Sequence, residues 1–188
     1  MLSAPFRDHN HCFVSIPALL FPEENPMSAH TVTLDTIENF LSQKRLAMIG
    51  ISRDPKDFTA MLFNELVRRG YEVIPVNPNA SRVLDRACYA RVQDIEPHVE
   101  AALLMTSPDV TESVVLDCAL AGVRHIWMYG AGGKGAVSLK ALSFCEEHGI
   151  HVVPGECPFM FFPNNGFHRL HGFLRKISGN YPKHEHHA

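Results

Sequence analysis

One stretch near the first third of the chain carries the residue types that bind phosphate. Gly50, Ile51 and Ser52 directly follow the apolar run 46–49, and Arg53 and Lys56 come next. Glycine lets a backbone approach a ligand closely, and a helix expected to begin either near Asp54 and Pro55 or at Asp57 would direct its N-terminal N–H groups at the same point. The stretch therefore predicts a phosphate-binding loop, although a tight strand–helix turn needs the same glycine.

A second glycine-containing stretch offers an alternative site. Residues 130–135 read Gly-Ala-Gly-Gly-Lys-Gly and match G-x-G-x-x-G, and Glu156 follows about 20 residues later, where a ribose-binding acid is expected. This pattern favours an NAD-binding enzyme or redox sensor that uses the loop from Gly130 to Gly135. The stretch follows the fourth expected strand instead of opening the series, so a flexible loop that closes over a ligand, or simply a loop, explains it equally.

Candidate catalytic residues are few. Cys157 precedes a proline, and His168 and His171 lie on an expected helix, so a nucleophilic or metal-binding Cys–His pair is one interpretation. No third partner accompanies them, and a cysteine in an apolar run is usually a core residue. Because no nucleophile is accompanied by a base and an orienting group, we expect binding without catalysis.

The elements that would position these residues follow a regular rhythm. Buried strands are expected at 46–49, 73–76, 101–105, 125–129 and 150–153, with amphipathic helical stripes between most of them. A glycine ends the helical stripe before three of these strands, at Gly70, Gly122 and Gly149. This repetition predicts an α/β fold: a Rossmann-like open parallel sheet of about five strands with helices on both faces.

Right-handed crossovers bring the carboxyl ends of all these strands to one edge, where open α/β sheets bind ligands. We therefore expect the Gly50 loop to meet the residues that follow the other strands, namely Asn77, Pro78, Arg82, Ser107, Pro108, Tyr129 and Gly130.

Composition restricts the function classes. The chain has 188 residues and a net charge of -3, which favours one domain and argues against general nucleic-acid binding. No apolar run is long enough to cross a bilayer. Five cysteines without a C-x-x-C pair predict free thiols and a reducing, cytoplasmic location.

The two ends of the chain differ from the middle. We expect residues 1–27 to be a disordered extension or an upstream mis-start, residues 28–161 to form the ligand-binding domain, and residues 162–188 to hold a C-terminal helix and a polar tail. The tail contains His184, His186 and His187, for which solvation is favoured over adventitious metal binding. Residues 157–181 are the expected contact for an oligomer or a protein partner.

The chain from about Ile37 to Phe161 resembles the small bacterial CoA-binding proteins, which are similar to the N-terminal domain of the succinyl-CoA synthetase α subunit. The matching motifs are Ile-Gly-Ile-Ser at 49–52, Gly-Tyr-Glu-Val-Ile-Pro-Val-Asn-Pro at 70–78, Ser-Pro at 107–108, Ile-Trp at 126–127 and Cys-Pro at 157–158. The chain departs from the family pattern at Ile51, where alanine is usual, and at Tyr129, where glutamine is frequent.

This resemblance implies a Rossmann-like domain that binds CoA or an acyl-CoA. The pyrophosphate of CoA would suit the loop of Gly50, Ile51 and Ser52, and its 3′-phosphate would suit Arg53, Lys56 or Arg82. A stand-alone binder of this ligand, the NAD-binding alternative and a subunit that works through a partner remain three distinct hypotheses.

Overall fold

A five-stranded parallel sheet forms the centre of the protein in the computed structural model, which describes residues 32–131, 134–162 and 182–184. Its strands lie in the order β2 (Glu72–Val76), β1 (Arg45–Ile49), β5 (Ala101–Leu104), β6 (His125–Met128) and β9 (His151–Pro154). All four neighbouring pairs are parallel. The Rossmann-like open sheet predicted from the sequence is therefore confirmed.

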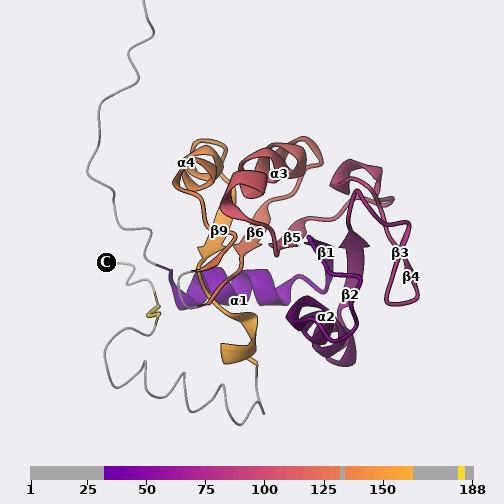
Figure 1. The fold of residues 1–188 in the computed structure, drawn as a ribbon. Helices are drawn as coiled ribbons and strands as arrows, with labels where there is room; N and C mark the ends of the chain where they lie inside the picture. The colour runs from indigo at the N-terminus through magenta and orange to yellow at the C-terminus, as the bar shows by residue number, and fades with distance from the viewer. Residues whose placement is uncertain (1–31, 132–133, 163–181, 185–188) are drawn as a thin grey trace, which may run out of the picture. The chain divides into compact units, whose positions relative to one another are not determined.

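Helices cover both faces of this sheet, as Figure 1 shows. The helices α1 (Leu34–Ser42) and α2 (Phe58–Arg68) lie on one face, and α3 (Pro108–Leu120) and α4 (Leu139–Glu147) lie on the other. Successive strand residues point to opposite faces. In β1, Leu46 and Met48 accordingly pack with residues of α1 and α2, whereas Ala47 and Ile49 pack with residues of α3 and α4.

The helix ends agree with the repeated sequence pattern. Gly70 follows α2 with φ +84° and Gly122 follows α3 with φ +83°. These left-handed conformations are the ones that favour glycine after a helix. Asp57 caps the N-terminus of α2, so of the two starts expected for this helix the later one is correct.

Several short elements connect the main ones. The strands β3 (Arg82–Val83) and β4 (Arg86–Ala87) form a hairpin, as do β7 (Gly130–Ala131) and β8 (Lys134–Gly135). The short 3-10 helices of the described residues are η1 (Val92–Asp94) and η2 (Pro158–Met160). The turn between β3 and β4 places Leu84 and Asp85 at φ +48° and +59°. A leucine rarely adopts this conformation, so the hairpin could not be predicted from the residue types at its turn.

The expected extension at 1–27, the expected C-terminal helix within 162–188 and the contact surface at 157–181 lie wholly or largely outside the described residues, and these assignments stay predictions. Among the described helices, none combines the length and the apolar character needed to span a membrane.

Candidate functional site

The strand order creates a switch point at the carboxyl end of β1. The chain passes from β1 to β2 on one side, and later enters β5 on the other side. Open α/β sheets bind ligands in the region outside such a switch point. The loops that follow β1 and β5 are in direct contact there, because a Cβ atom built on Gly50 would lie 2.9 Å from the Met105 carbonyl oxygen.

The loop after β1 is fixed by hydrogen bonds to the end of β2. The Gly50 amide donates to the Val76 carbonyl at 3.1 Å, and Nδ2 of Asn77 donates to the Ile51 carbonyl at 3.0 Å. Oδ1 of Asn77 in turn accepts a hydrogen bond from the Asn79 amide at 2.9 Å. Asn77 therefore holds the loop through the N–H end of its side-chain amide, whereas its oxygen fixes the turn after β2 in which Pro78 lies.

A chain of hydrogen bonds joins the same loop to the first turn of α2. The Ser52 amide donates to Oγ1 of Thr59 at 2.9 Å, and the Thr59 hydroxyl donates to Oδ1 of Asp57 at 2.6 Å. Asp57 also accepts the Thr59 amide at 2.8 Å, which makes it the N-cap of the helix. The N-terminus of α2 thus carries a carboxylate, and the Ser52 amide already has a partner. Both features leave the loop with fewer donors for phosphate than its sequence suggested.

The N-terminus of α3 is more open to an anion. Ser107 occupies its N-cap position and Pro108 its first turn, but the exposed Ser107 side chain makes no capping hydrogen bond. In the other three described α-helices, the side chain of the N-cap residue accepts a backbone N–H group. Since the N–H groups of a first helical turn need acceptors, α3 presents unused donors beside the switch point.

The three candidate cations come from two segments. Arg53 and Lys56 are exposed in the connection between β1 and α2, and Arg82 is exposed in β3. Nη2 of Arg82 donates to the Asp85 carbonyl at 2.7 Å, which ties this guanidinium to the turn of its own hairpin. Its remaining N–H groups can still serve a ligand, because a guanidinium has five donors.

Aromatic side chains line the neighbouring part of the edge, and two of them were not predicted as site residues. The Tyr129 ring lies 5.2 Å from that of Phe58, which in turn lies 5.7 Å from that of Phe159. Burial, with a smaller contribution from Cys157, raises the pKa of Tyr129. The position of Phe58 directly after a helix cap was visible in the sequence, but its contact with Tyr129 depends on the fold.

The glycine-rich run does not adopt the arrangement of a dinucleotide fingerprint. Gly130 and Gly135 pair with one another in the antiparallel β7–β8 hairpin, and α4 begins only after its N-cap at Ser138. Backbone packing explains both glycines: a Cβ atom on Gly130 would lie 2.6 Å from the Gly155 Cα, and one on Gly135 would overlap the Tyr129 carbonyl. The match to G-x-G-x-x-G therefore does not place a helix N-terminus at these glycines.

The described cysteines do not form a nucleophilic site. Burial raises the pKa of the Cys157 thiol, and it raises that of Cys145 to about 12. Burial also raises the pKa of Cys118. These thiols stay protonated near neutral pH, which argues against a reactive thiolate. His168 and His171, which the sequence suggested as partners of Cys157, lie outside the described residues.

The fold and the loops at its switch point define a Rossmann-like α/β domain of the class that binds ligands at the carboxyl edge of the sheet. A family model described as a CoA binding domain (CoA_binding_2) matches residues 44–163, which is more than half of the chain. The chain therefore belongs to this family, and the family predicted from the sequence motifs is confirmed.

Known proteins that resemble the chain include both large enzymes and small proteins. It is 26% identical over 143 residues to an ADP-forming acetate–CoA ligase II of Archaeoglobus fulgidus, covering 72% of this chain and 21% of the ligase. It is 27% identical over 128 residues to the α subunit of an ADP-forming acetate–CoA ligase II of Pyrococcus furiosus, covering 64% of this chain and 28% of the subunit. The chain thus spans about a fifth to a quarter of these curated relatives.

A solved structure has a similar fold. A hypothetical protein from Pyrococcus horikoshii OT3 superposes with a TM-score of 0.63 at 27% identity, covering 72% of this chain and 93% of that protein.

Proposed function

We propose that this chain binds CoA or an acyl-CoA at the carboxyl edge of its sheet and has no catalytic activity of its own. The observation that carries the proposal is the meeting of the Gly50 loop with the uncapped N-terminus of α3 at the switch point. In a chain of the CoA binding domain family, this is the place where a ligand with phosphate groups is expected.

The phosphate groups of CoA have candidate contacts at this edge. We assign the pyrophosphate to the loop of Gly50, Ile51 and Ser52 together with the first turn of α3 at Ser107 and Pro108. The candidate cations are Arg53 and Lys56, which follow the Gly50 loop in the sequence, and Arg82, which is carried by the β3–β4 hairpin. Asn77 holds the loop from the β2 side and Pro78 follows it in the turn, and Tyr129 and Gly130 complete the edge beside the aromatic rings.

The proposal of binding without catalysis rests on the residues around this edge. The described thiols are kept protonated by burial, and the curated ligases are several times longer than this chain. Incubation of the protein with acetate or succinate, ATP and CoA should yield no acyl-CoA. Protein-dependent thioester formation would contradict the proposal. A cytoplasmic location and a partner that binds residues 157–181 are further parts of this proposal, and the free thiols of the described cysteines agree with a reducing compartment.

Calorimetric titration with CoA and dephospho-CoA tests the site. Hydrogen bonds to charged groups are worth about 1.5–3 kcal/mol, so Arg82→Ala or Arg53→Ala should weaken CoA binding about ten- to a hundredfold. The same change should matter little for dephospho-CoA, which lacks the 3′-phosphate. Arg124→Ala is the matched control, because Arg124 is also exposed but precedes β6 at the opposite edge of the sheet.

Three results would overturn this assignment. Equal losses of CoA affinity in Arg82→Ala and Arg124→Ala would show that the 3′-phosphate is not bound at this edge. Absence of CoA binding by the wild-type chain would refute the function itself. Tighter binding of NAD than of CoA would favour the alternative that uses residues 130–135.

A further inference from the structure

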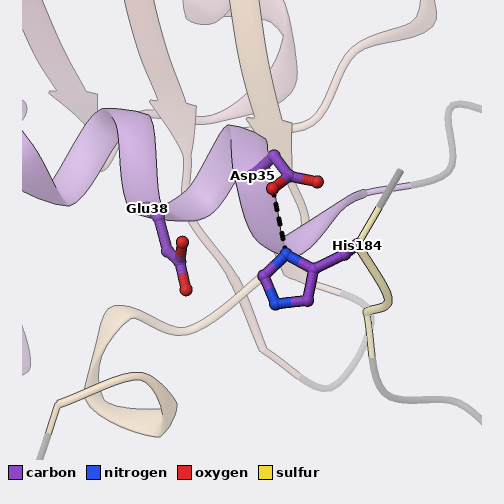
Figure 2. Close-up of side chains that lie close together, drawn as sticks. All are labelled: Asp35, Glu38 and His184. Atoms are coloured by element: carbon purple, nitrogen blue, oxygen red, sulfur yellow. Dashed lines mark hydrogen bonds and ion pairs between the residues drawn. The ribbon is translucent and has the colours of Figure 1, made fainter. Parts of the chain in front are cut away.

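Three side chains with metal-binding atoms meet at the start of α1, and none of them belongs to the loops described above. Asp35 and Glu38 are three residues apart on this helix and therefore share a face of it. His184 comes from the C-terminal segment and reaches the same face, as Figure 2 shows. Its Nδ1 atom lies 2.9 Å from Oδ1 of Asp35, and one donor atom from each of the three residues lies within 4.8 Å of the others.

The backbone holds His184 in this place. Lys183 pairs with Thr33 in a parallel bridge, and the Leu34 amide donates to the Lys183 carbonyl at 2.9 Å. Pro182, the residue before this pair, is buried. The His184 side chain is exposed, as expected for a polar tail, but it is tethered to a helix from the other end of the chain.

The charges of the group suit a divalent cation. With both carboxylates ionised and the imidazole neutral, as metal ligation requires, the three side chains carry a net charge of -2, which a divalent cation would neutralise. Imidazole nitrogen together with carboxylate oxygen is a ligand set for zinc and its neighbours in the first transition row, whereas calcium and magnesium favour oxygen ligands.

We propose that Asp35, Glu38 and His184 bind one divalent transition-metal ion such as Zn²⁺, and that this ion clamps the C-terminal segment to α1. Zinc binds these donors at about 2.0–2.2 Å, which requires donor atoms about 3.4 Å apart in a tetrahedral shell. Exposed side chains reach this spacing from within 4.8 Å by small rotations, and water completes the shell.

Calorimetric titration of the chelator-treated full chain with Zn²⁺ tests the proposal. We expect one tightly bound Zn²⁺ per chain, and a melting temperature that rises with Zn²⁺ because the metal binds the folded state. Asp35→Asn, Glu38→Gln and His184→Gln should each weaken binding at least about tenfold, since even residues that only support metal ligands contribute that much. Glu147→Gln, an equal change of charge at an exposed position of α4, should leave Zn²⁺ binding unchanged.

A double variant separates this site from simple chelation by the tail. His186→Gln with His187→Gln should keep the one-to-one binding and the shift in melting temperature. Loss of binding in this double variant, combined with unchanged binding in Asp35→Asn and Glu38→Gln, would overturn the proposal. Mg²⁺ binding as tight as Zn²⁺ binding would also overturn it, because a site that includes an imidazole should discriminate between the two. None of these results bears on CoA binding, which uses other loops.

Discussion

Gly50 offers a quantitative test of how the switch point is built. A side chain at this position meets two obstacles: the backbone has φ +87°, and a Cβ atom would lie 2.9 Å from the Met105 carbonyl oxygen and 3.0 Å from Cγ2 of Thr106. Gly70 has almost the same backbone conformation, φ +84°, with no atom within 4 Å of its Cβ position. The two glycines therefore separate backbone strain from steric contact.

The expected losses in the free energy of unfolding follow from the backbone strain and the steric contact. A left-handed conformation costs a residue with a Cβ atom roughly 1–2 kcal/mol, so Gly70→Ala should lower the free energy of unfolding by about that amount. Gly50→Ala should cost the same plus about 1–3 kcal/mol for the forced contact, or about 2–5 kcal/mol in total. For a chain of this size each kcal/mol lowers the melting temperature by about 2–4 °C.

Urea unfolding of both variants beside the wild type measures the difference. Equal losses of stability in Gly50→Ala and Gly70→Ala would show that the β1 and β5 loops do not press against one another, and would refute the packing described for the switch point. The result also decides how ligand-binding data are interpreted. A loss of CoA binding in Gly50→Val would not by itself show that the ligand contacts Gly50, because the contact with Met105 means that this change also disturbs the fold.

Two further predictions concern the helix α2 and its loop. The hydrogen-bonded Arg68 guanidinium is the main cause that lowers the pKa of Glu65 from 4.5 to about 2, so this carboxylate stabilises the fold above pH 4.5 and loses that contribution as the pH falls towards 2. Glu65→Gln should therefore lower the free energy of unfolding by up to about 1 kcal/mol at pH 7 and by less at pH 3, as measured by urea unfolding. If the free energies of unfolding of the variant and the wild type changed in parallel with pH, the prediction would be contradicted. Thr59→Val removes the acceptor of the Ser52 amide and should lower the free energy of unfolding by about 1–3 kcal/mol. The control Ser113→Ala removes an exposed hydroxyl contact and should cost less than about 0.5 kcal/mol. Equal shifts in melting temperature for the two variants would refute the bridging role of Thr59.

The main elements could be predicted because their signals are local. Each strand of the sheet is a short apolar run, and Gly70 and Gly122 mark the ends of α2 and α3 within the sequence itself. The convergence of Gly50 with Asn77 also followed from the sequence, because parallel strands joined by right-handed crossovers end at the same edge. The bond from Asn77 to the Ile51 carbonyl confirms that these two segments meet.

The remaining features depend on contacts between distant residues. Nothing in the spacing of residues 130–135 shows that Gly130 is needed because the Gly155 backbone lies against it, and the run was therefore open to interpretation as a nucleotide fingerprint. The pairing of His184 with Asp35 spans 149 residues. Nothing in the sequence distinguishes Thr59 from other helical residues. Only the structure shows that its hydroxyl lies between the Ser52 amide and Asp57.

The single tryptophan of the chain gives the fold its own optical probe. Trp127 is fully buried, with edge-on contacts to Phe40 and Phe161, and its indole N–H donates to the Glu156 carbonyl at 2.8 Å. Its fluorescence should therefore be that of an indole shielded from water, and should shift to longer wavelength on unfolding. Because Glu156 follows β9 at the carboxyl edge, a ligand that moves this edge would alter the same emission, so one signal reports both on folding and on binding without any attached dye.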